Sequence, residues 1–190
     1  MYQKYNTEAL VLGSRETGES DRVYALFTKD FGLVRARASS VRSEKSLIRY
    51  ALQNYSRAYV SLVRGRRGWR AAGAAAIKTA SGDVRGVGAF ARISELVLRL
   101  IHGEEANEYL FAALSEAHDA LTQKKCDAFG TIEIVCVARI LYTLGYISNE
   151  ALSTALFTHT AYTGESLLEA ETMRDKLLSS INKAIAETQL

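Results

Sequence analysis

Apolar and polar residues alternate along the first 80 residues with the period of two that is typical of β-strands. Short polar or glycine-containing segments interrupt the alternation and are typical of turns. The pattern predicts five strands, with a short helix between the third and the fourth. The expected strands are residues 7–14, 22–28, 33–38, 56–64 and 70–77, and the expected helix is 43–53.

The alternation also assigns faces to the third and fourth strands. Two arginines, Arg35 and Arg37, are expected on the face opposite to the apolar one in the third strand. In the fourth strand, one face is expected to carry Ala58, Val60 and Leu62. The opposite face is expected to carry Arg57, Tyr59 and Ser61. Three strands, a helix and two more strands follow one another in the OB-fold, a small five-stranded barrel. The sequence therefore predicts an OB-fold β-barrel over residues 1–80.

Beyond residue 80 the apolar residues recur at helical spacing, with Ser81-Gly82-Asp83 at the junction. Residues 129–144 are apolar nearly all round, which predicts a buried central helix that ends at Gly145. The fold class is therefore α+β, with a helical domain at 81–190. The helices are expected near 90–101, 110–121, 129–144, 148–157 and 165–187.

Charge separates the two parts of the chain. The whole chain has a net charge of +3, but residues 1–80 carry +9 and residues 81–190 carry −6. Between Val34 and Arg70 there are ten basic residues and one acidic residue, Glu44. A solvated surface normally mixes both signs, so this band favours binding to an anion such as nucleic acid. The acidic helical part is expected to dock proteins instead.

The stretch Arg64-Gly65-Arg66-Arg67-Gly68-Trp69 concentrates this chemistry between the fourth and fifth strands. Glycines favour a turn, arginines bind phosphates, and aromatic rings can stack on bases. Trp69 could instead pack in the barrel, and the alternation allows both. The band runs on to Arg70. The expected DNA-binding residues are Arg35, Arg37, Arg42, Lys45, Arg49, Arg57, Tyr59, Arg64, Arg66, Arg67 and Trp69.

Motifs for cofactor, metal or covalent chemistry receive no support. Residues 86–91 match GxGxxA, but they lack the strand–helix–strand context of a dinucleotide site. Cys126 and Cys136 are ten residues apart, which favours packed thiols over a zinc site. The three histidines form no ligand pair and are expected at the surface or at helix ends. We therefore expect a protein that is not an enzyme, with no metal and no cofactor.

Three carboxylates, Glu16, Glu19 and Asp21, cluster between the first two expected strands. Paired carboxylates can serve acid–base catalysis or bind a metal ion. Neither a histidine nor a second acidic motif accompanies them. Arg15 and Arg22 are natural ion-pair partners, so a polar connection between strands is the favoured interpretation.

A series of short motifs runs along the amino-terminal part of the chain: Ala9-Leu10-Val11-Leu12, Gly18-Glu19-Ser20-Asp21-Arg22, Leu26-Phe27-Thr28, Phe31-Gly32-Leu33, Lys45-Ser46-Leu47 and Leu52-Gln53. In these motifs the chain resembles the RecO family of bacterial recombination mediators. A weaker likeness extends into the helices at Glu95-Leu96 and 139–146. The family commonly has Lys-Gly at Ser39-Ser40 and proline at Asn54, and some members carry a four-cysteine zinc module that this chain lacks.

The resemblance implies an amino-terminal OB-fold followed by helices. It also implies a role in DNA repair and homologous recombination: binding single- and double-stranded DNA, annealing complementary strands and helping RecR load RecA. An RNA-binding OB-fold protein remains an alternative. So does a non-catalytic adaptor that binds an acidic protein through its basic face.

A groove between helices would suit an apolar peptide end. The resemblance implies that this peptide is the C-terminal tail of single-strand binding protein. Because that tail is acidic, a basic rim from Arg92, Arg99 or Arg139 would be needed. The sequence has neither a long apolar span nor an apolar signal segment. We therefore expect a protein of the bacterial cytosol that associates with the nucleoid and not with a membrane.

Overall fold

The computed structural model describes residues 3–41, 43, 46–123, 127–148, 152 and 154–187. Contacts divide the chain into two compact units. The first is Met1–Ser81 with Ser94–Glu108, and the second is Gly82–Ile93 with Tyr109–Leu190. The first unit therefore holds residues from both sides of the boundary expected at residue 80.

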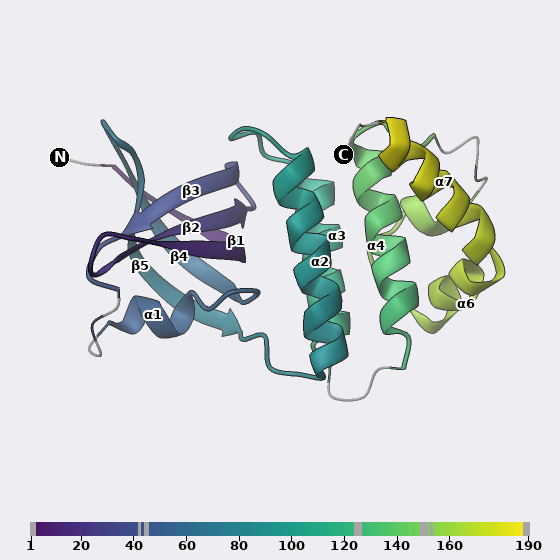
Figure 1. The fold of residues 1–190 in the computed structure, drawn as a ribbon, viewed down its shortest axis with the longest axis horizontal. Coiled ribbons are helices and arrows are strands. Elements are labelled where there is room, and N and C mark those ends of the chain that lie inside the picture. The colour runs from purple at the N-terminus through teal and green to yellow at the C-terminus, as the bar shows by residue number, and fades with distance from the viewer. Residues whose placement is uncertain are drawn as a thin grey trace. The chain divides into compact units, whose positions relative to one another are not determined.

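The first unit contains a closed barrel of five strands, in the order β1-β2-β3-β5-β4 (Figure 1). This confirms the predicted OB-fold, with its helix between the third and fourth strands. The elements are β1 (Lys4–Thr17), β2 (Asp21–Thr28), β3 (Gly32–Ala38), α1 (Leu47–Ala51), β4 (Arg57–Gly65) and β5 (Gly68–Lys78).

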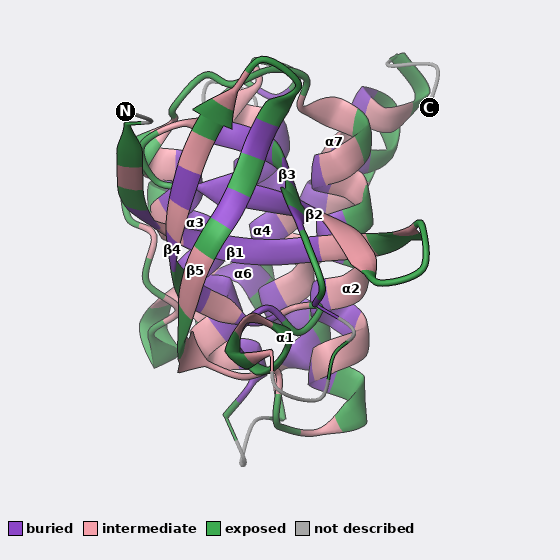
Figure 2. Ribbon diagram, turned by 90° about the vertical axis from the view of Figure 1, so that its left-hand side faces the viewer, coloured by how far each residue is buried: buried purple, intermediate pink, exposed green. Residues whose placement is uncertain are grey.

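Alternation along the strands forms the barrel core. Figure 2 shows buried and exposed positions following one another along β3 and β5. On β3 the apolar residues at 34, 36 and 38 are buried and the two arginines are exposed, as predicted. A short parallel pairing of β3 with β5 closes the sheet, which removes the open edges that would otherwise invite further strand pairing.

Helix α1 packs on the barrel core through its apolar side. Ala51 and Leu52 are buried, and Ile48 is packed against the same cluster. The opposite side exposes Leu47 and Tyr50, of which 80% and 56% of the surface is accessible. The helix thus presents one apolar and one aromatic side chain next to the basic residues of the barrel surface.

The segment that follows helix α2 (Val84–Leu100) belongs to the barrel unit and touches it closely. Gly32, at the turn into β3, has φ +64°, and a Cβ there would overlap the backbone of Glu105. Only glycine fits both the left-handed conformation and this close approach. The acidic pair Glu104-Glu105 is thereby held beside the barrel.

The second unit is helical. It contains α3 (Glu108–Leu121), α4 (Phe129–Thr143), the 3₁₀ helix η1 (Ala155–Phe157), α6 (Gly164–Thr172) and α7 (Arg174–Glu187). Helix α4 buries most of its residues, which confirms the predicted central helix. Gly145 follows with φ +80°, and its N–H and that of Tyr146 bond back to Tyr142 and Leu141. This is the expected glycine termination.

The single helix predicted over 165–187 is wrong, because the structure breaks it at Met173 into α6 and α7. The Thr172 hydroxyl donates to the Glu169 carbonyl at 2.7 Å, a side-chain bond of the kind that bends helices. Periodicity alone does not register such a break. In the segment 148–157, where a short helix was predicted, residues 149–151 and 153 lie outside the described residues. Of the described ones, Leu152 is helical and residues 155–157 form η1.

Candidate nucleic-acid interface

A tight hairpin turn joins β4 to β5 and carries two arginines at its tip. Gly65 pairs with Gly68, so Arg66 and Arg67 form a two-residue turn and both are exposed. Gly68 has φ +97°, a conformation that side chains rarely adopt. The glycines therefore allow the hairpin, and the turn aims its two charges into solvent.

The parallel contact between β3 and β5 adds two more arginines beside this turn. Arg37 and Arg70 are register partners, and both are exposed on the outer side of the sheet. Together with the turn they border a groove of about 440 Å³. Among the described residues, four arginines and no acidic side chain line it. The lining residues are Arg37, Ser39, Val63, Gly65, Arg66, Arg67, Gly68, Trp69 and Arg70.

Acidic partners hold some of the basic residues but not all. Arg37 pairs with Asp21 at 2.7 Å, Arg57 with Glu8 at 3.0 Å, and Arg64 with Glu104 at 3.3 Å. Within the described part of the chain, Arg66 and Arg70 form no ion pair, and the same holds for two further exposed arginines, Arg35 and Arg67. Exposed charges without a counter-ion are the ones a phosphate backbone can use at least cost.

Trp69 lies in the barrel core, with 5% of its surface accessible. Its ring meets Tyr5 and Phe31 at centroid distances of 5.5 and 5.4 Å, and the Arg64 guanidinium lies 5.3 Å from the ring centre. The two alternatives for Trp69 were stacking on a base and packing in the barrel. The structure shows the second, so the ring is not accessible to a base. Its indole N–H is buried without an acceptor in the described residues.

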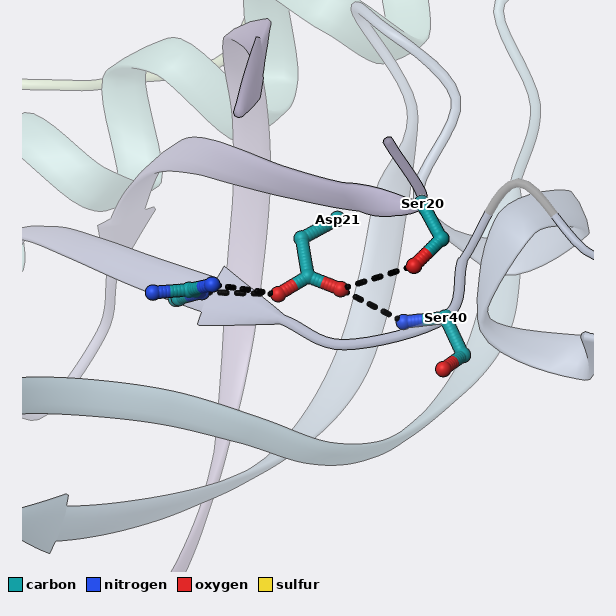
Figure 3. Close-up of polar contacts among 4 residues, drawn as sticks. Ser20, Asp21 and Ser40 are labelled. Atoms are coloured by element: carbon teal, nitrogen blue, oxygen red, sulfur yellow. Dashed lines mark hydrogen bonds and ion pairs between the residues drawn. The ribbon is translucent and has the colours of Figure 1, made fainter. Parts of the chain in front are cut away.

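Asp21 holds the end of β3 in place through the polar contacts drawn in Figure 3. Its carboxylate accepts from the Ser40 backbone N–H at 2.9 Å and from Arg37 Nε at 2.8 Å. The hydrogen bond from Ser40 and then that from Arg37 lower the pKa of Asp21. Ser40 has φ +54°, so this serine occupies a left-handed position that suits the glycine expected from the family pattern.

Other expected binding residues lie away from the groove. Tyr59 is exposed on β4, four residues before the groove-lining Val63, which is about 13 Å along a strand. Arg57 is near the start of β4, and Arg49 on α1 lines two other cavities. Arg42 and Lys45 lie outside the described residues. Arg70 was part of the basic band but not among the expected binding residues, because only the β3–β5 register brings it beside Arg37.

The remaining candidate motifs have structural roles. Glu16 pairs with Arg22 at 3.1 Å, as expected for a polar connection between strands. Gly86 lies inside helix α2, where a Cβ would overlap the Leu121 carbonyl, so it permits close helix packing. His118 lies in the last turn of α3, a helix end as expected, and it is fully buried against Phe90 rather than at the surface.

The helical unit contains a cavity of about 640 Å³ around the segment 155–169. Arg139, which lines it, is fully buried and donates to the carbonyls of Leu156, Thr160 and Ala161 at 2.9, 2.7 and 3.3 Å. Of the other arginines considered for a basic rim, Arg92 is engaged by Glu133 through two 2.7 Å hydrogen bonds. Arg99 belongs to the barrel unit.

Burial governs the titration of the groups behind this cavity. It raises the pKa of Cys136 to about 12 and that of Tyr162 well above its usual value. The thiol is therefore protonated at neutral pH and behaves as a packed apolar group. Cys126 lies outside the described residues.

Two kinds of feature were not found among the described residues, a cluster of metal-ligating side chains and a membrane-spanning helix. No three His, Cys, Asp or Glu side chains there are grouped to hold an ion. No helix in the described ranges combines the length and the apolar character that crossing a bilayer requires.

The barrel order, the interposed α1 and the arginine groove define an OB-fold with a basic groove on its surface. Residues 1–72 match the family described as "Recombination protein O N terminal". Over these residues the chain is similar to the RecO family.

Several relatives carry the description "DNA repair protein RecO". One from Desulfitobacterium hafniense is 42% identical over 62 residues, which is 33% of this chain and 23% of that protein. One from Dehalococcoides mccartyi is 37% identical over 62 residues, covering 33% and 24%. One from Pelotomaculum thermopropionicum is 30% identical over 113 residues, covering 58% and 44%. The match thus spans less than half the length of these relatives.

Proposed function

We propose that this protein binds nucleic acid through the arginine groove and acts in DNA repair and recombination as a non-enzymatic mediator. The observation that carries the proposal is the groove itself, in which the described lining residues contribute four guanidinium groups and no carboxylate to one concave surface. Guanidinium groups bind phosphates in a bidentate manner and neutralise them.

The chemistry of the groove suits both single- and double-stranded DNA. Contacts to phosphates carry no sequence information, so they act on either form. Neutralised phosphates repel each other less, so two complementary strands can approach on the same protein, which is what annealing requires. The role of helping RecR to load RecA rests on the family alone and belongs to the same proposal.

Salt dependence tests the groove directly. Four phosphate contacts predict that log K for a single strand falls with log salt at a slope of about −3, at ~0.7 per contact. Replacing Arg66 and Arg67 together by glutamine should flatten the slope by about 1.4. The matched control replaces Lys176 and Lys183 on α7 by glutamine. Both lysines are exposed, so this double substitution removes the same charge from another surface. An unchanged slope in the Arg66/Arg67 variant would exclude the groove as the binding surface.

Competition separates the alternative ligands. Labelled single-stranded DNA bound to the protein is challenged with unlabelled DNA, with RNA of the same sequence and with an acidic protein. We expect DNA to compete best and to be annealed to its complement. RNA as the stronger competitor would favour an RNA-binding protein, and the acidic protein as the stronger competitor would favour an adaptor.

We further propose that the cavity of the helical unit docks an apolar, acidic peptide end such as the tail of single-strand binding protein. The support is its volume and its apolar lining by Ala155 and Leu156. Glu165 also lines the cavity and opposes an acidic peptide, so the affinity should rise when it is replaced by glutamine. If NMR signals of residues 155–166 do not shift as the peptide is added, the cavity is not the docking site.

A further inference from the structure

Two adjoining cavities lie on the barrel beside α1, away from the arginine groove. Their volumes are about 380 and 340 Å³, within or near the range of small-molecule pockets, about 300–1,000 Å³. Arg22 of β2 and Arg49 of α1 line both cavities. The groove and these cavities share no lining residue, so occupancy of one can be measured independently of the other.

The first cavity has the groups that bind a phosphate. The charged residues among its described lining are Arg22, Arg49 and Glu16, which together carry a net formal charge of +1. Glu16 already accepts from Arg22 Nη2 at 3.1 Å, but its side chain is 54% exposed. An exposed ion pair of this kind contributes little to stability, so a phosphate can displace the carboxylate.

Buried donors near the first cavity lack acceptors. Arg22 Nε is buried without an acceptor among the described residues, and the buried Tyr24 hydroxyl meets the Arg22 guanidinium, which can only donate, so its own O–H has no acceptor there either. Burial raises the pKa of Tyr24, against the opposing effect of the Arg22 guanidinium, so the hydroxyl stays a donor at neutral pH. Buried donors without acceptors are uncommon in folded proteins, and an anion bound by Arg22 would supply one.

The second cavity has the groups that bind a base. It is lined by Tyr50, Leu52, Gln53 and Asn54 in addition to the two arginines. Tyr50 is more than half exposed, and the Arg49 guanidinium lies 5.9 Å from its ring centre. Ser14 donates to Asn54 Oδ1 at 2.8 Å, which leaves the Asn54 amide NH₂ free to donate to a base edge.

From this arrangement we propose that the two cavities form one site for a single nucleotide. The phosphate lies between Arg22 and Arg49, and the base stacks on Tyr50 within reach of Gln53 and Asn54. Stacking on an aromatic ring is tolerant of base identity. The nucleotide is either free or the end of a strand, since both present the same phosphate and base.

The test is a two-dimensional ¹H–¹⁵N NMR titration of the full chain with inorganic phosphate, adenosine and adenosine 5′-monophosphate. The monophosphate should shift the signals of Arg22 and of residues 49–54, and it should bind more tightly than phosphate or adenosine alone. Trp69, the single tryptophan, lines the groove and reports on it separately. Its fluorescence should respond to DNA in the groove but not to the monophosphate.

Variants make the assignment specific. Arg22→Gln and Arg49→Gln should each weaken binding of the monophosphate about tenfold, because each removes a charge-assisted hydrogen bond. Tyr50→Leu should weaken the monophosphate but leave inorganic phosphate unchanged. Arg15→Gln is the matched control, since Arg15 is exposed on β1 and lines neither cavity. Arg49 and Tyr50 are exposed, so their variants keep the test valid should Arg22→Gln not fold.

The outcomes separate the two sources of nucleotide. If a 5′-phosphorylated tetranucleotide shifts the same signals with a similar Kd, the site holds the end of a strand; if only the monophosphate does, it holds a free nucleotide. The proposal is overturned if the monophosphate leaves residues 49–54 unshifted or shifts residues 65–70 alone. It is also overturned if Arg49→Gln binds as tightly as the control.

Discussion

The arginines of the groove and the buried arginine of the helical unit carry the same guanidinium group in opposite surroundings. Arg66 and Arg70 are exposed, and within the described part of the chain neither forms an ion pair. Arg139 is fully buried, bonded to three carbonyl oxygens and positioned over the Tyr162 ring at 4.6 Å. The difference teaches that residue type alone does not indicate a ligand site. Donors left free by the protein are available to a ligand, whereas saturated donors hold the chain in place.

The largest effect is expected where the guanidinium is saturated. Arg139→Met should lower the free energy of unfolding by about 3 kcal/mol or more, because it leaves buried carbonyls without donors. Urea denaturation measures the loss. Single-strand binding by the groove should keep its salt slope wherever the variant is folded. A loss under about 1 kcal/mol would show that water replaces the guanidinium at little cost.

The same substitution in the groove should have the reverse profile. Arg70→Met should reduce affinity for single-stranded DNA about fivefold, since it removes one phosphate contact of the groove. The free energy of unfolding should change by no more than about 0.5 kcal/mol, as is usual for exposed positions. Fluorescence anisotropy and urea denaturation measure the two quantities. If Arg70→Met lost much stability but kept its affinity for DNA, Arg70 would have a structural role like that of Arg139, which would contradict the prediction.

Arg37 is an intermediate case, because it lines the groove but pairs with Asp21. The pKa of Asp21 is lowered in the folded protein, so its carboxylate stabilises the fold fully above the unfolded value of 3.8. Asp21→Asn should therefore be less stable than the parent protein at pH 7. The difference should shrink as the pH falls below 3.8. Denaturation at pH 7 and at a series of acid pH values tests this, and a difference that persists unchanged into acid would contradict it.

The smallest effect is expected at Glu104, which pairs with Arg64 beside the groove. Glu104→Gln should raise affinity for single-stranded DNA about twofold, because a partly exposed ion pair is worth about 0.2–1 kcal/mol. The gain should disappear at high salt, where the pair is screened. Glu116→Gln on α3 is a control of equal charge in the helical unit. An equal gain in both variants would indicate net charge alone rather than competition for Arg64.

The elements that follow from local patterns could be predicted from the sequence. Alternation located five strands, and the continuous apolar character of 129–144 identified the central helix. Both predictions succeed because a residue's face depends on its own position in a strand or helix. The break at Met173 and the burial of His118 could not be predicted in this way. The break coincides with a side-chain bond to the backbone, and the burial depends on contact with Phe90.

The candidate interface was only partly predictable for the same reason. The sequence showed a basic band between Val34 and Arg70 but not which of its members meet. Barrel closure places Arg37 beside Arg70, leaves Tyr59 farther along β4 and turns Trp69 inward. Counter-ions from elsewhere in the chain then engage Arg57 and Arg64. Contacts between residues distant in sequence decide these outcomes.

The sequence by itself determined the five-stranded barrel, the helical part, the charge asymmetry and the resemblance that the family comparison confirmed. These depend on periodicity, composition and short motifs, which are properties of neighbouring residues. Only the tertiary structure decided which arginines share a groove, which are neutralised, and that Arg139 is a buried support for the segment 156–161. Whether a charged side chain can bind a ligand depends on its burial and on the ion-pair partners that folding brings to it. Neither can be read from the neighbouring residues in the sequence.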